Sequence, residues 1–299
     1  MNFSVVIPTY NRPDDLNRCL DSILGQLVKP VEIIIVDDGN LPDIVINNLK
    51  IKIEDKKINF IYYKKNHKYE RRGSSESRNK ALELSRNNVV FILDDDVILE
   101  EYDFFEKIIK IWSQNTDKNL IGIGGKIKNE RKINKLENIY NHIFGLIGKC
   151  KWDVNNVGFQ VWDQSIKNVI KSYYVHGGVC SYNKKLTQKI GFTTFNEGRT
   201  ALEDVDFCLR AKNQGYFFLL EPNARVIHNQ SLVAREKEFV SGFKEEINRR
   251  IIFKNNCKKN IKNYLWFVWA NIGWILRQFL AGHFIKGVGM IKGSLPNLK

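Results

Sequence analysis

Three consecutive aspartates, Asp94, Asp95 and Asp96, stand directly after the apolar run 89–93. Adjacent carboxylates repel one another, so a strand end suits them poorly unless a cation lies among them. Divalent ions such as Mg²⁺ and Mn²⁺ prefer oxygen ligands, and one or two carboxylates commonly hold them together with phosphate groups. The run therefore predicts a metal and phosphate site at the carboxyl end of a buried strand. The alternative is a solvated acidic loop.

A second carboxylate pair, Asp37 and Asp38, follows the β-branched run 31–36 in the same way. A third apolar run, 3–7, opens the chain and leads into a polar turn at 8–12. Helical patterns at 14–26, 75–85 and 102–112 alternate with these runs. Together they predict an α/β fold with a parallel sheet, whose strands end at one functional edge.

Five short motifs occur in order along the chain and carry a family resemblance. They are Val-Val-Ile-Pro-Thr-Tyr-Asn-Arg at 5–12, Val-Asp-Asp-Gly at 36–39, Glu-Ser-Arg-Asn at 76–79, Asp-Asp-Asp at 94–96 and Glu-Asp-Val-Asp-Phe at 203–207. Each motif alone is weak evidence, but together they resemble the family 2 glycosyltransferases, nucleotide-sugar enzymes of the GT-A fold. The resemblance covers about residues 1–230. It implies a Rossmann-like, mostly parallel sheet with flanking helices.

The same resemblance implies a division of the chain. We expect a catalytic domain at 1–230, with a nucleotide-binding half at about 1–125 and an acceptor-binding half at 126–230. Residues 231–299 lie outside the resemblance, and we expect a helical extension there that is both apolar and basic.

On the donor side, the resemblance assigns roles to the three aspartates. It implies that Asp94 lies near the ribose or the donor sugar, and that Asp96 ligates Mg²⁺ or Mn²⁺. Asp95 fits either role. The metal would neutralise the charge that develops on the diphosphate leaving group as the glycosidic bond breaks.

Asp37 and Asp38 resemble the pair that reads the base and ribose of the nucleotide. Carboxylates suit this task because they accept hydrogen bonds from ring N–H groups and ribose hydroxyls. The alternative is an ordinary turn at Asp38 and Gly39.

The turn after the first strand is expected to form a loop under the base. Its candidate donor-binding residues are Pro8, Thr9, Tyr10 and Arg12. Tyr10 would flank the base and Arg12 would approach the nucleotide, and the alternative is a helix-leading loop with a solvated arginine.

Arg78 and Asn79 lie early in a predicted helix and complete the donor-binding set. Arg78 suits hydrogen bonding to phosphate or to the three aspartates. A plain surface salt bridge is the alternative.

On the acceptor side, the pair Glu203 and Asp204 precedes a helical pattern. Transfer to a hydroxyl requires a general base, and the family resemblance assigns it to Asp204. Glu203 would orient the base or the acceptor, although two acids at this place can simply stabilise a helix N-terminus. Gly177 and Gly178 would let backbone approach the donor sugar or the acceptor.

His228 follows the strand-like run 224–227 and, by resemblance, completes the metal site; a structural histidine is the alternative. His176 has no clear role from sequence. The chain contains no Gln-x-x-Arg-Trp motif and no array of membrane spans, which indicates an enzyme that adds a single sugar.

The charge of the chain is +14 and unevenly distributed. Residues 231–299 hold 13 Lys or Arg and 4 Glu, a net charge of +9. Such an excess favours a polyanionic partner, either an anionic membrane or nucleic acid. The five cysteines lack paired spacing, which argues against a disulfide framework and a zinc site. With a first strand at the N-terminus, we expect a cytoplasmic enzyme without a signal peptide.

The segment Tyr264–Gly282 is the most apolar part of the chain. Its uncharged portion, Tyr264–Leu276, is shorter than the roughly 20 residues that a membrane span needs. Its tryptophans and the preceding lysines favour a helix on the inner face of the membrane. These residues are Trp266, Trp269, Trp274, Lys254, Lys258, Lys259 and Lys262. The alternatives are packing on the catalytic domain, packing on a second subunit, or a true span.

The expected activity is inverting, metal-dependent transfer of one sugar from a nucleoside-diphosphate sugar to a lipid-linked or cell-surface glycan. A nucleotidyltransferase is one rival, but it would carry a glycine-rich phosphate loop after the first strand. A nucleic-acid-binding protein is another, but the aromatic residues of the tail stand in an apolar block rather than among the basic ones. We therefore expect no nucleic-acid partner.

Overall fold

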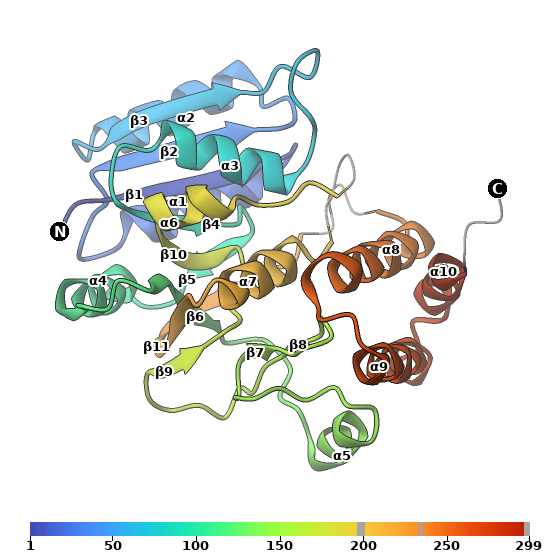
Figure 1. Ribbon diagram of the computed structural model, residues 1–299. Coiled ribbons are helices and arrows are strands. Elements are labelled where there is room, and N and C mark those ends of the chain that lie inside the picture. Colours follow the sequence, from blue (N-terminus) through green and yellow to red (C-terminus); the bar gives the residue numbers. More distant parts are fainter. Residues whose placement is uncertain (196–200, 232, 234–235, 296–299) are drawn as a thin grey trace.

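A nine-stranded mixed sheet forms the centre of the molecule, in the order β3-β2-β1-β4-β10-β6-β11-β5, with β9 paired to β11 (Figure 1). The computed structural model describes residues 1–195, 201–231, 233 and 236–295. The strands are β1 (Phe3–Thr9), β2 (Glu32–Asp37), β3 (Asn59–Lys64), β4 (Val89–Leu93), β5 (Val97–Leu99), β6 (Leu120–Ile127), β9 (Ile170–Ser172), β10 (Val179–Asn183) and β11 (Phe217–His228). Two short strands, β7 (Asp153–Val154) and β8 (Gln160–Val161), pair separately.

The first half of the sheet is parallel, as the apolar runs predict. β2 pairs with β1 and β3, and β4 pairs with β1, all in the parallel sense. Every residue of β2 and β4 is buried, which explains their continuous apolar runs. β10 then enters between β4 and β6 in the antiparallel sense. The predicted α/β fold with a mostly parallel sheet is confirmed.

Helices cover both faces of this sheet (Figure 1). One face packs against α1 (Pro13–Leu24), α2 (Asp43–Glu54) and α4 (Phe104–Gln114). The opposite face packs against α3 (Ser74–Leu84), α6 (Lys184–Ile190) and α7 (Glu203–Asn213). Side chains alternate between the two faces along each strand, so Val5 and Ile7 join the first core while Val6 joins the second.

Four further helices lie on the right and at the bottom of the molecule in Figure 1: α8 (Glu238–Asn256), α9 (Ile261–Leu280) and α10 (Phe284–Ser294) on the right, and α5 (Lys135–Ile143) at the bottom. The predicted helical extension is therefore present. None of the helices in the described ranges combines the length and the apolar character that crossing a bilayer requires.

Glycines bring α10 into direct backbone contact with α8. A Cβ atom on Gly289 would lie 2.2 Å from the carbonyl oxygen of Phe239, and one on Gly293 would lie 2.8 Å from that of Phe243. Both contacts are closer than real Cβ atoms approach, so neither position accepts a larger residue without a shift of the helix. These two helices consequently behave as one packed unit.

The extension is joined to the rest of the chain by a third apolar cluster. Phe267 and Trp274 of α9 pack with Phe159, which lies in the loop beside β8. The buried guanidinium of Arg249 lies over Phe159 with 4.3 Å between them, and also bonds to Glu245. Part of the extension is thus a packing element.

We predict that Glu246 makes the stability of this helical unit depend on pH. Glu246 is fully buried, accepts a hydrogen bond from Asn271, and has its pKa raised by burial to about 7. The folded protein therefore holds this proton more tightly than the unfolded chain does. The stability that this bound proton adds to the folded protein is complete below about pH 4.5 and is lost as the pH rises through 7.

Urea unfolding at pH 5, 6, 7 and 8 tests this prediction. The free energy of unfolding should fall over this range by up to about 3 kcal/mol, and Glu246→Gln should flatten the dependence. The exposed Glu83→Gln serves as the control. Equal slopes in the wild type and in Glu246→Gln would exclude this carboxyl as the cause.

Candidate functional site

The three consecutive aspartates follow β4 but occupy different surroundings. Asp95 points inward, where it accepts hydrogen bonds from the Thr9 hydroxyl at 2.7 Å and from Arg12 at 3.0 Å. Burial raises the pKa of Asp95 to about 6 in spite of these donors. Asp95 therefore ties the loop after β1 to the end of β4, and it brings Thr9 and Arg12 to the acidic edge.

Asp96 is surrounded by positive charge and hydrogen-bond donors. Its oxygens lie 3.1 Å from His228 Nε2, 3.1 Å from the backbone nitrogen of Ser231 and 3.5 Å from Arg12. Burial alone would raise its pKa, but the hydrogen bond and charge of His228, with the other donors, hold it at about 2. Asp96 is thus ionised at neutral pH.

Asp94, Asp96 and His228 form a cluster with the chemistry of a metal site. One ligand atom from each lies within 4.8 Å of the others. Pairing of β11 with β5 places His228 opposite Val97, directly after the aspartates. Within the described residues this is the one group of three or more acidic, histidine or cysteine side chains close enough to share an ion. Two carboxylates and an imidazole fit a divalent cation.

Arg78 joins the donor and acceptor sides of the site. This residue of α3 is almost fully buried, and its guanidinium lies 3.0 Å from Asp94 and 2.8 Å from Glu203. Burial opposes its charge, but the two carboxylates raise the pKa of Arg78 above its usual value. The side chain faces the carboxylates, so it is not a surface salt bridge.

Gly177 and Gly178 close the site from the start of β10. A Cβ atom on Gly178 would lie 2.0 Å from a carboxylate oxygen of Asp94. One on Gly177 would lie 3.1 Å from Arg78 Nη1 and 3.2 Å from the Cβ of Asp204. The absence of side chains here therefore lets the backbone reach both acidic groups.

Glu203 and Asp204 form the first turn of α7, where negative charge is favourable. Glu203 binds Arg78 and the hydroxyl of Ser74, and burial raises its pKa. Asp204 instead accepts hydrogen bonds from the backbone N–H of Val205 at 2.8 Å and the Tyr174 hydroxyl at 3.1 Å. The two neighbouring acids are therefore held by different partners.

Tyr174 and His176 belong to this site, although the sequence alone indicates a role for neither of them. The Tyr174 hydroxyl lies 3.3 Å from His176 Nδ1, and His176 Nε2 lies 3.4 Å from a carboxylate oxygen of Glu130. Trp152 meets the His176 ring edge-on at 5.3 Å. A line of polar groups thus runs from Asp204 to Glu130. The only signal in the sequence is the position of both residues just before Gly177.

Two of the predicted donor-binding residues have their polar atoms occupied elsewhere. Asp37 is fully buried and accepts hydrogen bonds from the backbone of Gly39 and Leu41 and from the Tyr62 hydroxyl. Asn79 bonds through both its oxygen and its nitrogen to the backbone of Phe192, each at 2.9 Å. In this structure both side chains hold loops together.

The other predicted donor-binding residues lie around the same edge. Asp38 is bonded to the backbone of Gly73 at 2.7 Å and paired with Lys65 at 2.6 Å. Pro8 is the penultimate residue of β1, and Tyr10 lies exposed just beyond that strand. Tyr10 thus remains accessible to a ligand, whereas Asp38 is engaged.

Comparison with known proteins decides the family. Residues 4–173 match the family described as Glycosyl transferase family 2. The chain belongs to this family, and it is a glycosyltransferase.

Several relatives share this similarity. A glucosyl-dolichyl phosphate glucuronosyltransferase from Haloferax volcanii is 27% identical over 236 residues, covering 76% of this chain and 69% of its own length. A poly(ribitol-phosphate) β-N-acetylglucosaminyltransferase, TarP from Staphylococcus aureus, is 28% identical, covering 55% of this chain and 54% of its own. Glycosyltransferase GlyA from Streptococcus pneumoniae is 33% identical over 36% of this chain and 15% of its own. The matches therefore span about half or less of the last two relatives.

Solved structures support the GT-A fold of this glycosyltransferase. The mannosyltransferase PcManGT from Pyrobaculum calidifontis, in complex with GDP-Man and Mn²⁺, has a TM-score of 0.59 at 14% identity, over 98% of this chain and 79% of its own. S. aureus TarS in complex with UDP-GlcNAc has a TM-score of 0.56 at 16% identity, over 90% of this chain and 71% of its own. The predicted family and fold are therefore confirmed.

We predict that Arg78→Met destabilises the enzyme strongly even without substrate. The change leaves the partly buried carboxylates of Glu203 and Asp94 without their shared positive partner, the buried Arg78. Removing one member of a buried ion pair costs about 3 kcal/mol or more. Arg86→Met is the control, because Arg86 is exposed and lies 3.8 Å from Glu32, so its loss should cost less than about 1 kcal/mol. Urea unfolding measures both, and similar losses would contradict a bridging role for Arg78.

Proposed function

We propose that this glycosyltransferase is inverting and metal-dependent, and that it moves one sugar from a nucleoside-diphosphate sugar to a hydroxyl of a lipid-linked or cell-surface glycan. The observation that carries the proposal is the bridge of Arg78 between Asp94 and Glu203. It sets a candidate metal cluster and a candidate base on two sides of one site. We assign catalysis to residues 1–230, in the two halves expected from the sequence, and leave 231–299 as an extension.

On the donor side, we assign Asp94, Asp96 and His228 to hold Mg²⁺ or Mn²⁺. When bound, the ion supplies positive charge beside the diphosphate leaving group. Two neighbours of similar fold were solved with GDP-Man and Mn²⁺ and with UDP-GlcNAc, which supports a nucleotide-sugar donor. Arg12 lies next to Asp96 and adds a fixed positive charge at the same place.

On the acceptor side, we assign the general base to Asp204. Glu203 is neutralised by Arg78, so it is the poorer candidate to take a proton from the acceptor hydroxyl. The Tyr174 hydroxyl fixes one oxygen of Asp204. A single base opposite the leaving group suits one in-line displacement, which inverts the anomeric configuration.

The names of two relatives support a phosphate-bearing acceptor class. One relative is named for glucosyl-dolichyl phosphate and the other for poly(ribitol-phosphate). We extend this class to the present enzyme, and we place the acceptor at the cytosolic face of the cell membrane.

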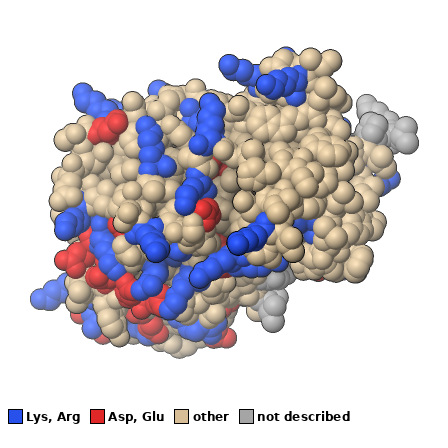
Figure 2. All heavy atoms as spheres, turned by 90° about the horizontal axis from the view of Figure 1, so that it is seen from below, with Lys and Arg blue, Asp and Glu red and all other residues tan. Residues whose placement is uncertain are grey.

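A surface formed by α9 and α10 supports this location. We call it the apolar face, and it consists of exposed side chains on both helices. They are Ile261, Tyr264, Leu265, Val268, Trp269, Ile272, Leu276, Leu280, Phe284, Ile285, Val288 and Ile291. Figure 2 shows a broad area with few charged side chains on the right, the side on which these helices lie. Patches of this kind mark contacts with membranes or proteins.

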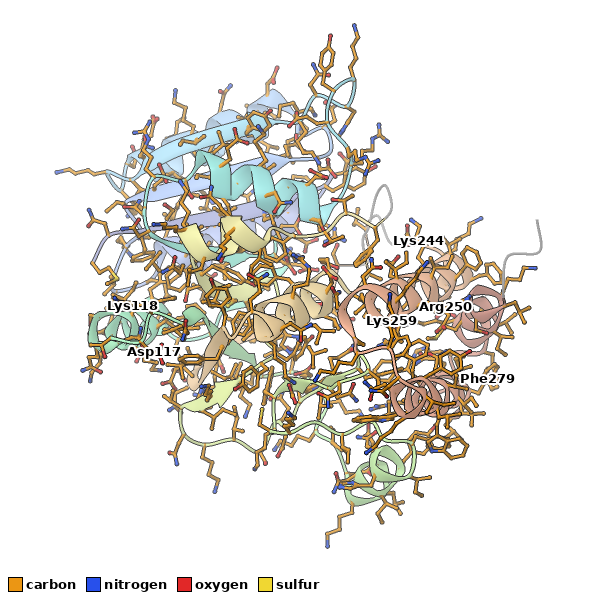
Figure 3. The ribbon with its side chains drawn as sticks, in the orientation of Figure 1. Asp117, Lys118, Lys244, Arg250, Lys259 and Phe279 are labelled. Atoms are coloured by element: carbon orange, nitrogen blue, oxygen red, sulfur yellow. The ribbon has the colours of Figure 1, made fainter. Side chains whose placement is uncertain are left out.

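We predict that Asp96→Ala abolishes metal-dependent donor binding and leaves the fold intact. The change removes a carboxylate from the proposed metal cluster. Calorimetric titration with GDP and UDP, with and without Mn²⁺, measures the effect. Asp117→Ala, in the loop at the far left of Figure 3, is the control. Metal-dependent binding of unchanged strength in folded Asp96→Ala would refute the ligand assignment.

We predict that Asp204→Asn reduces turnover at least a hundredfold while donor affinity changes by less than a few-fold. A general base contributes roughly 10²–10⁴ to the rate and little to donor binding. Steady-state kinetics and donor titration separate the two effects.

NMR of the wild-type product adds a second readout and should show an inverted anomer. Near-normal turnover of Asp204→Asn would transfer the role of base to Glu203. A retained anomer would contradict the proposed reaction itself.

We predict that the apolar face binds anionic vesicles reversibly. The wild type should co-sediment with phosphatidylglycerol vesicles at low salt and less at high salt, since each nearby lysine or arginine contributes about 1 kcal/mol. Leu265→Glu combined with Leu276→Glu should weaken binding at least tenfold, and Ile44→Glu on α2 is the exposed control. If the double variant instead dissociates a dimer and the wild type ignores vesicles, the face is a subunit contact.

A further inference from the structure

A groove between α8 and α9 lies outside the candidate catalytic site. Its volume is about 1000 Å³. Ile247, Ile251 and Phe253 of α8 line one wall, and residues of α9, among them Val268 and Ile272, line the other. The last turn of α10 contributes Gly293 and Ser294. Apolar grooves of this size bind long or bulky apolar ligands.

The packing of the three helices explains why the groove stays open. α10 lies against α8 through glycine contacts, while α9 turns toward the cluster around Phe159. α8 and α9 meet through Phe253 and Phe267, whose rings stack at 4.2 Å, and through the hydrogen bond from Asn271 to Glu246. Beyond these contacts the two walls are separated.

The groove carries a net positive charge. Lys254 and Lys259 line it and are exposed, and neither forms an ion pair with any residue of the described ranges. Arg250 donates to the carbonyl oxygens of Gly293 and Ser294 and so holds the end of α10. The acid among the lining residues, Glu246, is fully buried. Figure 3 shows Arg250 and Lys259 between α8 and α9.

We propose that this groove binds the hydrocarbon chain of a phosphate-bearing lipid, with the phosphate against Lys254 and Lys259. The apolar walls match the chain, and the two exposed ammonium groups match the anionic head. The exposed side chains of Val268 and Ile272 belong both to the groove and to the apolar face. A chain that leaves a bilayer along the apolar face therefore reaches the groove without crossing a polar surface.

The groove is linked to the catalytic site through α8. Asn248, on the same helix, donates to the carbonyl oxygen of Ala201 at 2.9 Å, two residues before Glu203. The assignment of this groove to the lipid part of the acceptor rests on the proposed function. It narrows the acceptor class to lipids that combine a long chain with a phosphate.

Binding of three probes to the full chain tests this proposal: oleyl phosphate, oleyl alcohol and inorganic phosphate. Calorimetry below the concentration at which the lipids aggregate should show one site for oleyl phosphate. Oleyl alcohol should bind at least tenfold more weakly, and inorganic phosphate should not bind below the millimolar range. The titration with inorganic phosphate distinguishes a lipid site from a site that binds any phosphate anion.

Two variants locate the site. Ile272→Trp fills the groove and should weaken binding of oleyl phosphate at least tenfold. Lys254→Glu with Lys259→Glu should remove the preference for oleyl phosphate over oleyl alcohol. Ile285→Trp is the control, because Ile285 is exposed on α10 and is not among the residues that line the groove. Melting temperatures confirm that each variant is folded.

Equal affinity of the wild type and Ile272→Trp for oleyl phosphate would overturn the proposal, as would equal binding of the two lipids by the wild type. Loss of self-association in Ile272→Trp without any lipid binding by the wild type would instead assign the groove to a second copy of the chain. Asp204→Asn should bind oleyl phosphate normally. A failure of the proposed reaction is therefore distinguishable from a failure of the groove.

Discussion

The buried guanidinium of Arg78 is the interaction on which the arrangement of the site depends. It lies between Asp94, which follows β4, and Glu203, which begins α7, and α3 supplies it. A buried cation needs close negative partners, so three elements distant in sequence must meet at one point. The close approach of Gly177 and Gly178 follows from the same requirement, because any side chain there would displace Asp94 or Arg78. The separation between the acidic groups is therefore set by the core and not by a mobile loop.

Asp94, Asp95 and Asp96 are identical residues in a row, but their different surroundings give them different properties. Asp95 is buried against Thr9 and Arg12 and has a pKa raised to about 6, whereas His228 and backbone donors hold the pKa of Asp96 at about 2. Residues 94–97 form a turn in which the Val97 N–H donates to the carbonyl oxygen of Asp94 at 3.2 Å, and within it Asp95 meets other partners than the residues on either side. Asp95 thus bonds to the end of β1 through Thr9, while Asp94 and Asp96 lie close to His228. Residue type alone cannot distinguish these tasks.

The sequence predicted those parts of the site that depend on strand ends and motif order. The shared edge of β1, β2 and β4 follows from apolar runs that end in polar residues, whereas the meeting of the aspartates with His228 was expected from the family resemblance. The antiparallel entry of β10 was not predicted, because a short apolar run does not encode its direction. The occupied side chains of Asp37 and Asn79 were not predicted either. Asp37 is bonded to the nearby N–H groups of Gly39 and Leu41 and also to Tyr62 of β3, and Asn79 is bonded to Phe192, far along the chain. The contact of Tyr174 with Asp204 is of the same kind.

The helical extension combines a tightly packed interior, formed around α8, with an exposed apolar surface on α9 and α10. One side of α8 buries Arg249 and Glu246 and packs directly against the backbone of α10. The outer helices α9 and α10 nevertheless keep many large apolar side chains exposed, which is unfavourable in water. Contiguous exposed apolar side chains of this kind are typical of surfaces that contact a membrane or another protein. Through Asn248, α8 also donates to the carbonyl oxygen of Ala201, so the helix that forms one wall of the proposed lipid groove contacts the chain two residues before Glu203.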